Sequence, residues 1–207
     1  MSMTSAFVEG LLLGLGLFTS VGPKDAFVIR RALFGRHLWL IVAICAGSDA
    51  LLIALGTGGL AALLMRYPLV VQVALWCGIA YLVCHGLLAL RGAMKGQTST
   101  PVADIAGRPP SFWQTLFATS AVSLLNPYAW VDTVLVIGAL TAGKAQAVRL
   151  PFTGGAVVAS LAWFLFLTYA AYAFRGLFDR AVAWRVLDGF VAFMMFGIAA
   201  HLAIGNL

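Results

Sequence analysis

The fold is decided by two short stretches, Gly22-Pro23-Lys24-Asp25-Ala26-Phe27 and Asn126-Pro127-Tyr128-Ala129-Trp130-Val131-Asp132. Each places a proline and charged side chains inside an apolar segment, and one stretch lies in each half of the chain. A proline lacks a backbone N–H and clashes with the carbonyl four residues earlier, so both stretches predict a broken helix. In hydrocarbon, such a break is tolerated only where it faces protein or a water-filled cavity. A broken helix with acids beside it in each half is typical of a transport site.

The composition predicts an all-α integral membrane protein. Apolar residues make up 62% of the 207 residues and charged residues only 10%. Because a membrane-spanning helix needs about 20 apolar residues, we expect six spans, the first and fourth of them broken. Their predicted ranges are 6–29, 38–64, 68–90, 112–140, 150–174 and 184–205. The polar stretch 92–111 separates a first three-helix repeat, 1–91, from a second, 112–207. An odd number of spans in each half makes the two repeats inverted relative to each other.

Lys and Arg in the loops predict the orientation. The first, third and fifth loops carry nine of them and the other two loops carry three. Basic loops stay in the cytoplasm, so both termini are expected outside, on the periplasmic side. The net charge of +6 is therefore read as a topology and lipid-headgroup signal, not as a signal for nucleic acid. A re-entrant first segment is the alternative, and it would place the N-terminus inside.

Three aspartates are the main candidates for substrate binding or proton coupling. Asp49 lies near the middle of the second span, where a carboxylate costs a few kcal/mol and is normally kept for a function or for a fixed ion pair. Asp25 either faces a cavity or forms an internal pair with its neighbour Lys24. Asp132 follows Pro127 by five residues, about one and a half helical turns beyond the second break.

Other polar residues near the breaks could line the cavity. The carbonyls of Thr19 and Ser123 are the ones that the prolines would free, Asn126 offers amide donors, and Trp130 could cover a bound cation. Ser48 precedes Asp49 directly. A solvated role is expected for the remaining acids and a packing role for His85 in the third span; the acids are Glu9, Asp104, Asp179 and Asp188. The stripe Gly10-x-x-x-Gly14-x-Gly16 would pack helices within the bundle or across a homodimer.

The sequence gives no sign of a cofactor, a metal centre or an enzyme. Cys45, Cys77 and Cys84 lie in apolar runs without a CxxC pair, which favours structural thiols. No Ser-His-Asp or His-cluster spacing is present. A transporter of small metal cations would use the same acids, but it usually has more convergent Cys, His or carboxylate ligands.

At these residues the chain resembles the LysE-type lysine and arginine exporters. The family's first-span motif S-[IL]-G-P-Q-N-[AV]-[FL]-V is similar to Ser20–Val28, and its fourth-span T-W-L-N-P-x-[AV]-Y-L-D is similar to Val122–Asp132. The second-span Ser48-Asp49, the third-span Cys77–Leu82 and the fifth-span Ala159–Phe164 also match. One departure stands out, because Lys24-Asp25 replaces the family's Gln-Asn.

The resemblance implies an exporter of amino acids in the bacterial inner membrane, driven by the proton motive force. Basic amino acids are the expected substrates, with the cations held by Asp49, Asp132 and Asp25 and the carboxylate near Pro23 or Pro127. Related branches resemble exporters of neutral amino acids such as homoserine, threonine and leucine. Lys24 could then occupy the subsite that another exporter offers to a substrate's ammonium.

Overall fold

The protein is all-helical in the residues that the computed structural model describes, 2–95 and 110–205. The helical elements form six passes along the chain, and their bounds follow. They are α1 (Met3–Phe18), α2 (Pro23–Ala32), α3 (Leu38–Leu55), η1 (Gly56–Leu60), α4 (Ala61–Leu64), α5 (Pro68–Lys95), α6 (Phe112–Leu124), α7 (Pro127–Ala129), η2 (Trp130–Ile137), α8 (Gly138–Ala142), α9 (Gln146–Ala173), η3 (Arg175–Asp179) and α10 (Ala181–Ile204).

Four continuous helical segments are long and apolar enough to cross a membrane. They are Leu38–Leu64, Pro68–Lys95, Gln146–Ala173 and Ala181–Ile204. Two bent pairs bring the number to six if each pair is one span. The first joins α1 to α2 at 81°, and the second joins α6 to the segment Pro127–Ala142 at 52°.

Both bends lie where the prolines predict them. Pro23 and Pro127 each occupy the first turn of the helix that follows the break, a position that needs no N–H donor and suits proline's fixed φ. The preceding residues, Gly22 and Asn126, are extended. Each break therefore ends one helix and starts another instead of merely kinking a continuous one.

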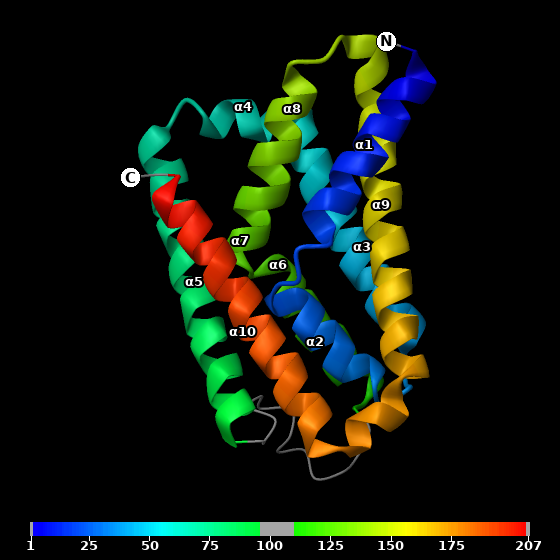
Figure 1. Cartoon of the computed structure of the whole chain (residues 1–207). Helices are drawn as coiled ribbons and strands as arrows, with labels where there is room; N and C mark the ends of the chain where they lie inside the picture. The colour runs from blue at the N-terminus through cyan, green and yellow to red at the C-terminus, as the bar shows by residue number, and fades with distance from the viewer. Residues whose placement is uncertain (1, 96–109, 206–207) are drawn as a thin grey trace.

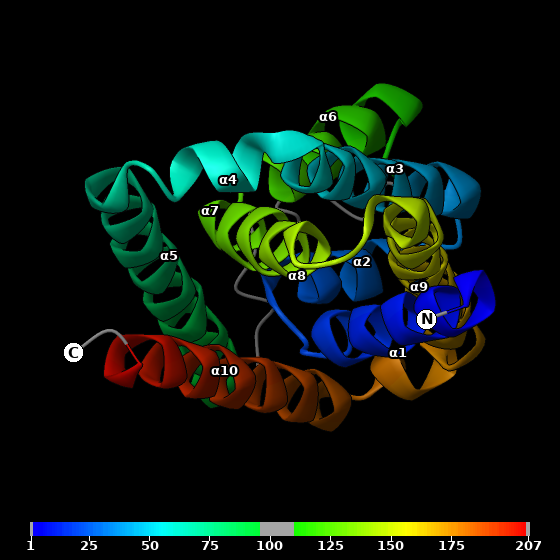
Figure 2. The same cartoon turned by 90° about the horizontal axis from the view of Figure 1, so that it is seen from above.

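The passes run between two opposite ends of the molecule (Figure 1). The N-terminal end of α1 and the C-terminal end of α10 lie toward the upper end, whereas the turn after α2 and the short helix η3 lie at the lower end. Seen from above, α2 and the α7–α8 segment occupy the middle, inside a ring formed by α1, α9, α3, α5 and α10 (Figure 2). The two helices that begin at the breaks are thus enclosed by the unbroken ones.

Small residues set the close packing of α1 against α9. A Cβ at Gly10 would collide with the Phe152 carbonyl, and one at Gly14 would press on Ala156 and Ala159. The stripe predicted from Gly10, Gly14 and Gly16 therefore packs inside the bundle at its first two positions, while Gly16 has nothing within 4 Å. A second core joins α5 to α10 around Leu82, Val191 and Met195, among others.

The boundaries differ from the sequence prediction in two places. α5 continues to Lys95, so the first four residues of the linker expected over 92–111 are helical. Residues 96–109 of that linker, with Asp104, lie outside the described residues. α9 begins at Gln146 instead of 150, because the extended Ala145 before it provides a helix start within the polar loop.

Candidate functional site

The first break is held by its own aspartate. Asp25, in the first turn of α2, accepts a hydrogen bond from the Gly22 backbone N–H at 2.8 Å. Its other oxygen accepts one from the Trp163 indole of α9 at 2.9 Å. A carboxylate at this position also complements the positive end of the helix dipole. Asp25 is therefore a buried helix cap with all its contacts inside the protein.

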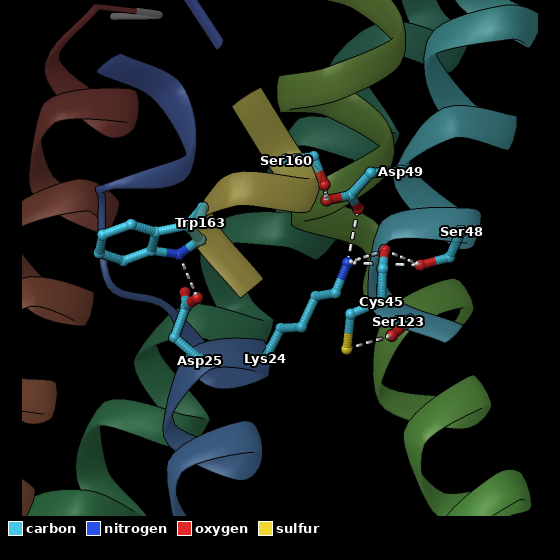
Figure 3. A network of polar contacts seen from close by, with 8 residues as sticks. All are labelled: Lys24, Asp25, Cys45, Ser48, Asp49, Ser123, Ser160 and Trp163. Carbon is cyan, nitrogen blue, oxygen red and sulfur yellow. Dashed lines mark hydrogen bonds and ion pairs between the residues drawn. The ribbon is translucent and has the colours of Figure 1, made fainter. Parts of the chain in front are cut away.

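Lys24 reaches from α2 across to α3 and binds Asp49 (Figure 3). Its ammonium lies 2.5 Å from Asp49 Oδ1, 3.1 Å from the Cys45 carbonyl oxygen and 3.3 Å from Ser48 Oγ. The ring of Phe164 lies beneath it, 4.5 Å from ammonium to centroid. Every N–H of the ammonium thus has an acceptor, and the cation is fully coordinated by protein.

Asp49 is satisfied on both of its oxygens. Oδ1 holds Lys24, and Oδ2 accepts a hydrogen bond from the Ser160 hydroxyl of α9 at 2.7 Å. Asp49 is 3% exposed and Lys24 is 7% exposed. The two charges form a buried ion pair that ties α2 to α3 and, through Ser160, to α9.

The internal Lys24–Asp25 pair considered from the sequence is wrong. Adjacent residues on a helix point in different directions, and here Lys24 turns toward α3 while Asp25 turns back toward the break and α9 (Figure 3). Of the two roles left open for Asp49, the ion-pair role is the one that the geometry displays.

The second break places Asp132 in a different environment. Asn126 caps α7 by accepting a hydrogen bond from the Tyr128 N–H at 3.1 Å. Asp132 follows in the π-helical segment η2, a wound form that is frequent at functional sites. Within the described part of the chain, the half-buried Asp132 carboxylate has no hydrogen-bond or ion-pair partner.

A small cavity of about 50 Å³ lies where the two breaks meet. Its lining combines groups from both breaks and from α3: Leu17, Phe18, Ser20, Gly22, Pro23, Lys24, Asp25, Asp49, Asn126, Tyr128, Ala129, Asp132, Thr133 and Phe164. The charged groups in this lining are three carboxylates and one ammonium, so the cavity is net negative. Its volume has room for a few water molecules but not for an amino acid.

Four residues expected as cavity lining lie elsewhere. Thr19 is exposed, and its hydroxyl bonds back to the Leu15 carbonyl. The Trp130 indole turns to the Leu124 carbonyl at the end of α6, 2.8 Å away, so it bridges the second break instead of covering the cavity. Ser48 and Ser123 are buried behind the lining: Ser48 holds Lys24, and Ser123 Oγ lies 3.8 Å from Cys45 Sγ.

The sequence reasoning assigned no role to three site residues of α9. Ser160, Trp163 and Phe164 contact Asp49, Asp25 and Lys24 respectively. Their spacing of three and four residues places them on one helix face, and a serine with two aromatics at that spacing is the signal that could have found them.

Asp188 is a second correction. The sequence favoured a solvated side chain near a loop, but Asp188 is fully buried and forms an ion pair with Arg30 of α2. The reason is that α10 begins at Ala181, so Asp188 lies two turns inside the helix and faces α2. Glu9, in contrast, forms an exposed pair with Lys144, and His85 stacks on Tyr81 as a packing residue would.

Among the described residues no group of three or more His, Cys, Asp or Glu side chains is placed to hold a metal ion. The carboxylates of the cavity are instead separated by the Lys24 ammonium and by the helix cap.

Comparison with known proteins places the chain among transporters. The sequence profile of the LysE type translocator family matches residues 15–206. The arginine exporter protein ArgO of Yersinia enterocolitica is 34% identical over 97% of each chain. ArgO of Photorhabdus laumondii is 31% identical over 97% of this chain and 96% of its own. A Mycobacterium tuberculosis protein provisionally named an amino-acid transporter is 37% identical over 91% of this chain and 92% of its own. No solved structure matches the chain significantly.

Proposed function

This chain belongs to the LysE type translocator family, and on that premise we propose that it exports amino acids, basic ones above all, across the bacterial inner membrane in exchange for protons. Two relatives that align along nearly its whole length carry the name arginine exporter. That likeness supports the substrate class.

The observation that carries the proposal is the charge of the cavity at the two breaks. Three carboxylates and one ammonium line it, and Asp132 is the carboxylate without a partner in the described part of the chain. A half-buried carboxylate without a partner attracts a cation strongly because little water screens it. The ammonium or guanidinium of a basic amino acid would meet that demand.

Export of a cation requires an energy source. Moving one positive charge out against an inside-negative potential costs about 2.3 kcal/mol per 100 mV. Exchange for one incoming proton cancels this electrical cost. Asp132 serves both flows in the proposed mechanism, since one carboxylate holds either a proton or the substrate's cation, and the alternation couples them.

The helix packing supports the two inverted three-span repeats, 1–91 and 112–207, that we propose. α3 packs against α9 and α5 against α10, which pairs the second span with the second and the third with the third. A two-fold axis that exchanges the halves would map both pairs onto themselves. The first spans also correspond, because α1 packs on α9 and α6 packs on α3. Alternating access would then arise from rocking one repeat against the other around the central cavity.

Counterflow in proteoliposomes tests the function. Vesicles loaded with unlabelled arginine should accumulate labelled arginine and lysine, and an imposed pH gradient should drive net arginine movement. Asp132→Asn should abolish both, whereas Glu9→Gln, which removes an exposed carboxylate far from the cavity, should not. Exchange of leucine or threonine with no exchange of arginine would contradict the basic substrate class and favour a neutral amino-acid exporter.

A further inference from the structure

The carboxylate of an amino acid has no ready receptor at the helix ends. The N-terminus of α2 is already capped by Asp25, and that of α7 is capped by the Asn126 side chain. Both sets of backbone donors therefore hold a side chain of the chain itself. The expectation that the substrate's carboxylate binds near Pro23 or Pro127 meets a competitor at each place.

Lys24 is the one cation among the described residues that line the cavity. Its ammonium is held on Asp49, on the Cys45 carbonyl and on Ser48, above the Phe164 ring. Those groups are what a substrate's α-ammonium would need: a carboxylate, two further oxygens and an aromatic face. The chain's own lysine thus occupies a ready-made ammonium subsite.

We propose that Lys24 recognises the substrate's carboxylate by exchanging ion-pair partners, an inference that rests on the proposed function. The α-ammonium of the incoming amino acid takes Asp49, Ser160 continues to hold the second oxygen of Asp49, and the displaced Lys24 ammonium pairs with the α-carboxylate. The cation of the side chain pairs with Asp132.

The exchange leaves no buried charge without a partner. Removing one member of a buried ion pair is strongly unfavourable, because it leaves an uncompensated charge in a medium of low dielectric constant. A zwitterion supplies both replacement charges at once, so each buried ion leaves one partner only as it gains another. The flexible four-carbon stem of lysine allows the ammonium to move while its backbone stays in α2.

Selectivity for amino acids over simple amines follows. Agmatine is arginine without its carboxylate, and cadaverine is lysine without its carboxylate. Either amine could displace Lys24 from Asp49 only by leaving Lys24 without an anion. Lys24 therefore excludes amines that are otherwise the same size and charge as the cationic part of the substrate.

The test is a competition between arginine and agmatine in proteoliposome exchange. We expect the wild-type protein to exchange labelled arginine at least about tenfold faster than agmatine, a ratio equivalent to one modest charge interaction. Lys24→Gln should bring the two rates to within about threefold. Lys24→Arg keeps a cation of similar reach and should retain most of the discrimination.

Each outcome decides the proposal. Equal exchange of arginine and agmatine by the wild-type protein overturns it without requiring any variant to fold. An unchanged ratio in a folded Lys24→Gln protein also overturns it and leaves Lys24 as a fixed structural pair. If the wild-type protein exchanges neither arginine nor any other amino acid, the proposed function fails first, and this inference fails with it.

Discussion

Asp49 and Asp132 line one cavity but have different surroundings. Asp49 is bound on both oxygens, by Lys24 and by Ser160, whereas Asp132 contacts no hydrogen-bond donor within the described residues. A residue with buried partners is needed for the fold as well as for transport. A residue without partners is free to bind a ligand.

We therefore expect Asp49→Asn and Asp132→Asn to abolish export in different ways. Asp49→Asn leaves the Lys24 ammonium buried without its counter-ion and should destabilise the protein by about 3–5 kcal/mol. Asp132→Asn removes a carboxylate without a partner and should change stability by less than about 1 kcal/mol. Membrane abundance and thermal unfolding in detergent measure the difference. Near wild-type export by either variant would exclude that residue from the proposed mechanism.

Lys24 should be coupled to Asp49 more strongly than to Asp25. In a double-mutant cycle on thermal stability, Lys24→Gln combined with Asp49→Asn removes both members of the buried pair together. It should be more stable than the two single changes predict, by about 1–3 kcal/mol. Lys24→Gln combined with Asp25→Asn should show a smaller coupling, because the two side chains bind different partners. A larger coupling in this second cycle would mean that Lys24 and Asp25 interact directly.

At the scale of the helices, the sequence predicted what proline and periodicity determine and missed what requires tertiary contact. The breaks at Pro23 and Pro127 follow from a missing N–H and a fixed φ, so they could be placed to the residue. The ion pair between Lys24 and Asp49 joins residues 25 positions apart on different helices, and no local pattern encodes it. Asp188 was misplaced for the same reason, since its partner Arg30 lies 158 positions away.

The π-helical segments also lacked a readable signal. Gly56–Leu60 and Trp130–Ile137 are wound more widely than an α-helix, yet their sequences read as ordinary apolar helix. Gly59, with φ of 114°, marks the first of them afterwards. The widened turn at Trp130–Ile137 directs Asp132 into the cavity, so its position could be predicted in sequence but not in orientation.

The packing of α1 on α9 should depend on single glycines. At Gly155 a Cβ would collide with the Phe7 carbonyl, whereas at the neighbouring Gly154 it would meet nothing within 4 Å. Gly155→Ala should therefore lower stability by about 1–3 kcal/mol through overpacking. Gly154→Ala is the matched control and should be neutral or slightly stabilising, since alanine favours the helix. Equal melting temperatures for the two variants would show that the two helices do not pack this closely.

At the scale of the whole molecule, charge and shape divide it into two ends. The turn after α2 and the helix η3 lie at the end opposite to both terminal helix ends (Figure 1). Of the nine basic residues assigned to the odd loops, Arg30 and Arg31 are buried in α2 and cannot contact headgroups. Seven against three still favours that end as the cytoplasmic one. The exposed Trp39 and Trp113 begin α3 and α6 at the same end, as interfacial anchors would.

Labelling of single cysteines tests this orientation and the six-span count together. After removal of Cys45, Cys77 and Cys84, Gly143→Cys and Gly176→Cys form a matched pair, because each glycine is exposed in a turn and a Cβ there meets no atom closer than 3.8 Å. Gly143 precedes α9 and Gly176 follows it, so a membrane-impermeant maleimide should label the first in intact cells and the second only after permeabilisation. Ser2→Cys decides the first segment. If α1 and α2 form one broken span, Ser2→Cys behaves like Gly143→Cys. If it is labelled only after permeabilisation while the glycine pair behaves as expected, the first segment is re-entrant and five segments cross the membrane.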